Sequence, residues 1–183
     1  MPPPSRRRSR DEQFVIAADQ HLVLVGLMAV GKTTVARAAA EQLARPLFDS
    51  DEMIEARTGR TVRQIFVDEG EPAFRVLETE VLNTALASAQ PAVIAAAGGV
   101  VMSDSNRAAL KAANAKVVWL RAEPATLMER IGGGTHRPAL DGDPAGTLQR
   151  MVHEREALYR EVADEIVCVD DLSVDQVVEA VLS

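Results

Sequence analysis

Residues 22–34 read Leu-Val-Leu-Val-Gly-Leu-Met-Ala-Val-Gly-Lys-Thr-Thr, and this stretch decides the fold. The apolar run 22–25 predicts a buried strand, and the Ala-rich run 33–43 predicts a helix. Between them stands the pattern G-x-x-x-x-G-K-T, which in this strand-to-helix context is typical of a phosphate-binding P-loop. The stretch therefore predicts a nucleotide-binding α/β domain.

The chemistry of phosphate binding accounts for the residue types in this loop. The glycines let the backbone curl so that successive N–H groups face phosphate oxygens, and the helix N-terminus adds a positive dipole end. Lys32 supplies a charge to the outer phosphates, and the Thr33 hydroxyl can ligate Mg²⁺. We expect ATP to contact Gly26, Ala29, Val30, Gly31, Lys32, Thr33 and Thr34.

Two carboxylates follow the second predicted strand, which begins at Pro46 and leads into Asp49. Asp49 would lie at the sheet edge where ligands collect in such folds, so it is the candidate partner of Thr33 at a magnesium site. Asp51 lies two residues further on. For Asp51 an N-cap of the following helix is the simpler alternative, and that role is compatible with a functional one.

The rest of the chain alternates short apolar runs with longer helical patterns. Strands are expected near 92–95, 117–120 and 166–169, and helices near 53–89, 106–113, 124–131, 148–162 and 174–182. Gly59 and Gly70–Pro72 are expected to interrupt the long helical stretch. Short strands joined by helices predict a three-layer α/β fold, with a five-stranded parallel sheet flanked by helices on both faces. Residues 132–146 are rich in glycine and predict a mobile lid.

Composition narrows the possible functions. The chain has 27 acidic and 20 Lys or Arg residues, a net charge of −7, which argues against nucleic acid as a partner. No apolar run is long enough for a membrane helix. One cysteine, Cys168, fits a reducing cytoplasm. Residues 1–12 predict a disordered, Arg- and Pro-rich arm, and residues 13–183 a single folded domain, which we expect to be a monomer.

Several motifs taken in order resemble those of the shikimate kinases. They are Gly26–Thr33, Phe48-Asp49-Ser50-Asp51, Phe74-Arg75 with Glu78, Gly98-Gly99, Arg137-Pro138-Ala139-Leu140, and Arg155 with Tyr159 four residues later. The resemblance covers essentially 22–183. It implies ATP-dependent phosphorylation of the 3-hydroxyl of shikimate, a small polyol that carries a carboxylate, in aromatic amino-acid biosynthesis.

The resemblance also implies roles for residues outside the P-loop. Arg75 and Arg155 match arginines that hold the shikimate carboxylate, a task suited to the planar guanidinium fork. Asp51 matches the aspartate that holds the ring hydroxyls and is the candidate base, beside Lys32 and Arg137 as catalytic residues. Gly98 and Gly99 match glycines that let the backbone approach the ring.

The lid supplies the remaining implied contacts. Arg137 would reach from it to the transferring phosphate, and closure would exclude water. Arg130 matches the position that packs on adenine. Taken singly, these residues have simpler explanations: Arg75 as a helix pair with Glu78, Arg155 as a charge on a solvated face, Gly98-Gly99 as a tight turn, and Arg130 as a surface arginine.

The chain departs from the family pattern at three places. Ala97 stands where the family usually has the first of three glycines, the loop interior Met28-Ala29-Val30 lacks the family's additional glycine, and the lid motif ends in Ala139-Leu140 rather than two leucines. None removes a charged group. These three departures bear on the identity of the acceptor molecule. The alternative to shikimate is a sugar acid such as gluconate, or a cyclitol. A nucleotide-binding protein without catalysis is a third hypothesis.

Overall fold

The computed structural model of the chain describes residues 16–131 and 142–183. Five parallel strands form one sheet in the order β2-β3-β1-β4-β5. Their bounds are β1 (His21–Val25), β2 (Leu47–Asp49), β3 (Val93–Ala95), β4 (Ala115–Arg121) and β5 (Glu165–Cys168). This is the predicted sheet.

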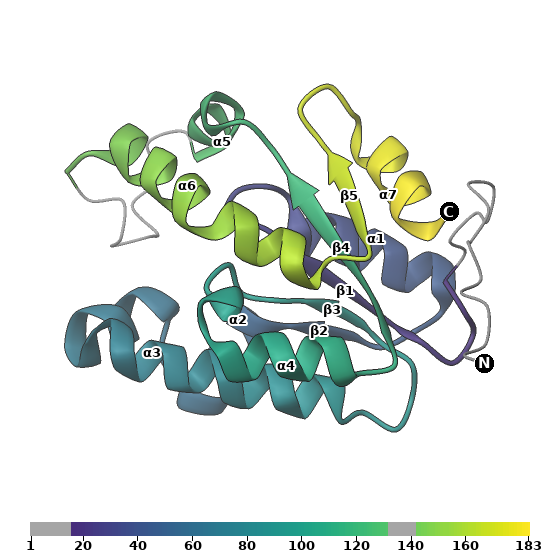
Figure 1. The fold of residues 1–183 in the computed structure, drawn as a ribbon. Coiled ribbons are helices and arrows are strands. Elements are labelled where there is room, and N and C mark those ends of the chain that lie inside the picture. The colour runs from purple at the N-terminus through teal and green to yellow at the C-terminus, as the bar shows by residue number, and fades with distance from the viewer. Residues whose placement is uncertain (1–15, 132–141) are drawn as a thin grey trace, which may run out of the picture.

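Helices cover both faces of the sheet (Figure 1). α1 (Lys32–Leu43) and α7 (Val174–Leu182) lie side by side behind it, and α3 (Val62–Leu86), α4 (Asp104–Ala112) and α6 (Pro144–Val162) lie in front. The others are α2 (Ser50–Thr58), the 3₁₀ turn η1 (Val100–Met102) and α5 (Pro124–Ile131). The predicted three-layer arrangement is therefore confirmed.

Buried aliphatic side chains explain why these segments become strands. All five residues of β1 are buried, because a central parallel strand is covered by helices on both sides. A second, smaller apolar cluster lies between α2 and α3 and contains Ile54, Val62, Ile65, Phe74 and Val81. α2 and α3 therefore pack against each other in this cluster, while Leu82 and Ala85 near the end of α3 belong to the main core.

Glycines end or interrupt the helices where the sequence predicted. Gly59 caps α2 in the left-handed conformation, and Gly70 breaks the helical path inside α3 with φ 80° and ψ 173°. The start of α6 differs from the expectation, since the helix begins at Pro144 rather than near Leu148. The Asp143 side chain accepts a hydrogen bond from the Gly146 N–H and Pro144 occupies the first turn, so 144–146 are helix and not lid.

Some predicted features fall outside the described residues. The arm 1–12 and lid residues 132–141, with Arg137, belong to them. Among the described residues, no helix is long and apolar enough to cross a membrane.

The C-terminus of α1 provides a test of backbone strain. Ala44 follows the helix with φ 50° and ψ 45°, and the N–H of Arg45 donates to the Ala40 carbonyl oxygen. A left-handed residue at this position is usually glycine, because a side chain costs about 1 kcal/mol there. We expect Ala44→Gly to raise the free energy of unfolding by up to about 1 kcal/mol in urea denaturation. Ala87→Gly, at the end of α3 with φ −84°, is the control and should lower it.

His21 makes stability depend on pH. Its buried Nδ1 accepts a hydrogen bond from the Ala92 N–H, and burial, followed by the charge of Arg45, lowers the pKa of His21 below 6.5. The unfolded chain therefore takes up a proton before the folded chain does, so stability is full above about pH 6.5 and falls below it. Denaturation at about pH 7.5 and about pH 5.5 should show this loss, reduced in His21→Gln. An unchanged pH dependence in the variant would contradict it.

Candidate active site

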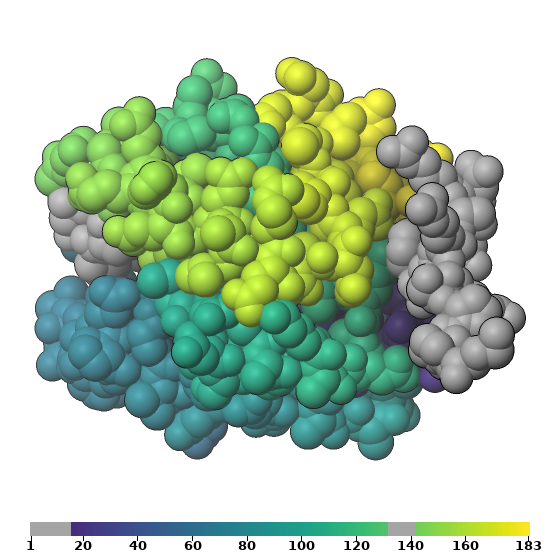
Figure 2. Space-filling view, viewed as in Figure 1, coloured from purple at the N-terminus to yellow at the C-terminus, as the bar shows by residue number. Residues whose placement is uncertain are grey.

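A cleft of about 930 Å³ opens at the carboxyl ends of the strands. The surfaces of α3 (blue) and α6 (green) face each other across this side of the molecule at the left of Figure 2. Most of the predicted site residues line it, namely Ala29, Gly31, Lys32, Thr33, Thr34, Asp49, Asp51, Arg75, Gly98, Gly99 and Arg155. The fold therefore brings together residues that are more than 120 positions apart in the sequence.

The P-loop joins β1 to α1 in a tight curve. Gly26 has φ 145°, and a Cβ at this position would lie 2.4 Å from the Leu120 carbonyl oxygen, so only glycine fits. The Lys32 ammonium donates to the carbonyl oxygens of Gly26 and Leu27, both at 2.9 Å. Lys32 therefore curls over the loop, with its charge beside the backbone N–H groups that would face phosphate.

Asp49 lies between the P-loop and α2. One oxygen, Oδ2, accepts a hydrogen bond from the Thr33 hydroxyl at 2.6 Å, and the other accepts from the N–H groups of Asp51 and Glu52. Asp49 is therefore the N-cap of α2. The alternative that Asp51 caps this helix is wrong, because Asp51 lies inside the first turn, where its side chain can face the cleft.

The acceptor side of the cleft combines carboxylates and arginines. Arg75 Nη1 donates to Glu78 Oε2 at 2.5 Å, and Arg75 Nε donates to Glu71 at 3.1 Å. Glu78 is 2% exposed. Burial raises the pKa of Glu78, while the charge of Arg75 acts in the opposite direction and that of Asp51 in the same one. The helix pair considered from the sequence exists, and it also lines the cleft.

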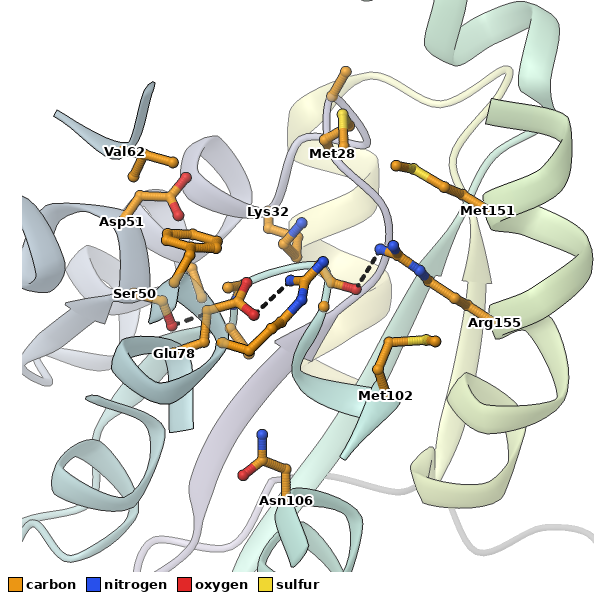
Figure 3. Close-up of a pocket in the computed structure, with 18 of the residues that line it drawn as sticks. Met28, Lys32, Ser50, Asp51, Val62, Glu78, Met102, Asn106, Met151 and Arg155 are labelled. Carbon is orange, nitrogen blue, oxygen red and sulfur yellow. Dashed lines mark hydrogen bonds and ion pairs between the residues drawn. The ribbon is translucent and has the colours of Figure 1, made fainter. Parts of the chain in front are cut away.

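Arg155 reaches the cleft from the opposite wall. It comes from α6 and points toward the space beside Lys32, across from Asp51 and Glu78 (Figure 3). Its side chain is buried at 6% exposure, so the alternative of a solvated helix face is wrong. Nη1 donates to the Gly98 carbonyl oxygen at 3.2 Å, and the buried Nε has no hydrogen-bond partner among the described residues.

Gly98 and Gly99 form a turn that also shapes the floor of the cleft. The Val100 N–H donates to the Ala97 carbonyl oxygen at 3.2 Å. A Cβ on Gly99 would lie 1.6 Å from Arg75 Nη1, and one on Gly98 would lie 3.3 Å from the Gly26 carbonyl oxygen. Side chains at these positions would displace the arginine or crowd the P-loop.

Three predicted ATP-binding residues lie behind the cleft surface or beside it. Gly26 and Val30 are buried parts of the loop. Arg130, at the end of α5, donates to the carbonyl oxygens of Val30 and Val169 at 3.1 and 3.0 Å. Its guanidinium thus joins the P-loop to the segment after β5, while the residue itself is exposed, as in the alternative of a surface arginine.

Sequence reasoning missed some residues of the site. Ser50 accepts a hydrogen bond from the Ala97 N–H at 3.2 Å and so attaches α2 to the glycine turn. Asn106 of α4 lines the cleft and donates to the Thr79 hydroxyl at 3.1 Å. The position of Ser50 between two candidate aspartates was a usable signal, whereas nothing in the sequence distinguishes Asn106.

Comparison with known proteins gives consistent matches. The shikimate kinase family model matches residues 28–183. The chain is 45% identical over 165 residues to a shikimate kinase from Symbiobacterium thermophilum, covering 88% of this chain and 94% of the relative. It is 42% identical over 159 residues to one from Thermobifida fusca, with 87% and 91% covered.

Solved structures agree with these matches. A shikimate kinase from Acinetobacter baumannii in complex with shikimate superposes with a TM-score of 0.85 at 36% identity, covering 89% of this chain and 90% of that one. A gluconokinase from Sinorhizobium meliloti superposes with a TM-score of 0.61 at 18% identity, covering 90% of each chain, which shows a shared fold alone.

Mutation of Asp49 can test its role as the N-cap of α2. Asp49→Ala removes the cap of α2 and should lower the free energy of unfolding by about 1–2 kcal/mol, whereas Asp49→Asn keeps a capping oxygen and should lose much less. Urea denaturation measures both. Ser173→Ala, which removes the N-cap of α7, is the control for loss of a cap away from the cleft. Equal losses for Asp49→Ala and Asp49→Asn would contradict the capping role.

Proposed function

We propose roles for the cleft residues from the premise that the chain belongs to the shikimate kinase family and is a shikimate kinase. Its reaction is the ATP-dependent transfer of a phosphoryl group to shikimate. The observation that carries the assignment of roles is that Arg75, Arg155 and Asp51 line one cleft together with the P-loop.

ATP lies on the P-loop in this proposal. Its phosphates accept hydrogen bonds from the N–H groups of 29–34, and Lys32 neutralises the outer phosphates. Arg130 borders the adenine, which its contact with the P-loop carbonyl of Val30 supports. Arg137 belongs to residues outside the described part, and its role on the transferring phosphate remains a proposal.

Thr33 and Asp49 form the protein part of a Mg²⁺ site. Their oxygens lie 2.6 Å apart beside the P-loop, and such hard donors suit this ion, together with phosphate oxygens and water. Among the described residues, no group of three or more His, Cys, Asp or Glu side chains could hold a metal, so the nucleotide has to complete the site. When bound, Mg²⁺ would neutralise charge on the phosphates.

Shikimate lies between α3 and α6. Arg75 and Arg155 hold its carboxylate, Gly98 and Gly99 allow the ring to approach the backbone, and Asp51 orients or deprotonates the reacting hydroxyl. The negative neighbour Glu78 holds the Arg75 guanidinium in place by accepting its hydrogen bond at 2.5 Å. We also propose a cytoplasmic monomer that acts without nucleic acid or a membrane.

A coupled ADP-release assay tests both the phosphorylation of shikimate and the proposed role of Asp51 as the base. We expect ATP-dependent turnover with shikimate and little with gluconate, and Asp51→Asn should lower kcat by about a hundredfold or more. The neighbouring Glu52→Gln is the matched control, since Glu52 is exposed and pairs with Arg37 outside the cleft. Absence of turnover above the ATP-only background in the unmodified protein would overturn the proposed function. Unchanged kcat in Asp51→Asn would overturn only the role of Asp51.

A further inference from the structure

The carbonyl oxygen of Gly98 receives two side-chain hydrogen bonds from the same helix. Arg155 Nη1 donates to it at 3.2 Å, and the Tyr159 hydroxyl donates to it at 2.6 Å. The two residues are four positions apart, so they lie on one face of α6. Tyr159 is 1% exposed and is not among the residues that line the cleft.

Gly98 lies between the P-loop and α6. It adjoins the P-loop at Gly26, and its neighbour Gly99 lies against the Arg75 guanidinium. Its carbonyl also fixes Nη1 of Arg155, which leaves the buried Nε edge of that guanidinium without a partner among the described residues. The position of this single carbonyl therefore sets the orientation of the Arg155 guanidinium, which lines the cleft.

Tyr159 is well suited to hold the carbonyl in place. Its ring stacks on Trp119 of β4 with centroids 5.5 Å apart and planes at 20°, so the central sheet fixes its orientation. Burial raises the pKa of Tyr159, and the hydroxyl therefore remains a donor throughout the physiological range. A neutral donor at 2.6 Å holds the carbonyl without a charge that would compete with Arg155.

We propose that Tyr159 is a positioning residue for the acceptor: through the Gly98 carbonyl its hydroxyl orients Arg155 and the glycine turn toward the substrate carboxylate. The inference rests on the proposed function, because it assumes that Arg155 binds a carboxylate. It assigns to Tyr159 an effect on acceptor binding although the residue lies outside the cleft.

Steady-state kinetics with shikimate provide the first test. In Tyr159→Phe the ring still packs but the carbonyl keeps only the longer bond, so the KM for shikimate should rise about tenfold. The KM for ATP should stay close to that of the unmodified protein. Trp119→Phe is the matched control, because it disturbs the same aromatic stack and keeps the hydroxyl. A structural role alone would lower the stability of both variants and leave the KM for shikimate unchanged.

A double-mutant cycle tests the proposed route through Arg155. The Arg155→Lys variant replaces the planar guanidinium with a compact ammonium group. Binding of a carboxylate to that group depends less on the orientation of the side chain. The effect of Tyr159→Phe on the KM for shikimate should therefore be smaller in the Arg155→Lys background than in the unmodified protein. If the effects of Tyr159→Phe and Arg155→Lys on the KM for shikimate were fully additive, Tyr159 would not act through Arg155 and the proposal would be overturned.

A third measurement needs no mutation. Tyr159 is the only tyrosine in the sequence, so uniform incorporation of 3-fluorotyrosine labels this site alone. We expect the single ¹⁹F resonance to shift when shikimate saturates the protein, because loading Arg155 changes the hydrogen bonds at Gly98. A resonance that does not move would overturn the inference. Failure of the unmodified protein to phosphorylate shikimate would overturn the proposed function and this inference with it, whereas turnover with an unchanged KM in Tyr159→Phe would overturn the inference alone.

Discussion

The Asp49 carboxylate accepts hydrogen bonds on both oxygens, and the two oxygens face different parts of the cleft. Oδ2 receives the hydroxyl of Thr33 at the start of α1, and Oδ1 receives the first free N–H groups of α2. Parallel pairing of β1, β3 and β2 brings these two helix starts to the same sheet edge. Because one rigid, buried group serves both, the phosphate-binding loop and the helix that carries Asp51 are held in a fixed relation.

The sheet and the P-loop could be predicted because their signals are local. Short apolar runs between helical patterns led to all five strands, and the eight-residue motif placed Lys32 and Thr33. The start of α6 was wrong by four residues, since the capping role of Asp143 depends on a hydrogen bond that composition does not reveal. The contact of Tyr159 with Gly98, which spans 61 residues, could not be predicted from spacing at all, because it depends on how α6 packs across the sheet.

The departures from the family pattern differ in their physical meaning. Ala29 lies in the left-handed region with φ 62°, the conformation that glycine adopts at least cost, so this chain carries some backbone strain in its P-loop. Ala97 is not among the described residues with positive φ, and its N–H bonds to Ser50. An alanine there needs no unusual backbone, and its methyl group is compatible with the turn that follows.

The separate apolar cluster between α2 and α3 has an evolutionary consequence. Because Ile54, Ile65 and Phe74 pack with one another rather than in the main core, substitutions around them can reshape the acceptor wall with little effect on the sheet and its loop. Mutations in the acceptor wall can therefore accumulate while the loop that holds ATP keeps its shape.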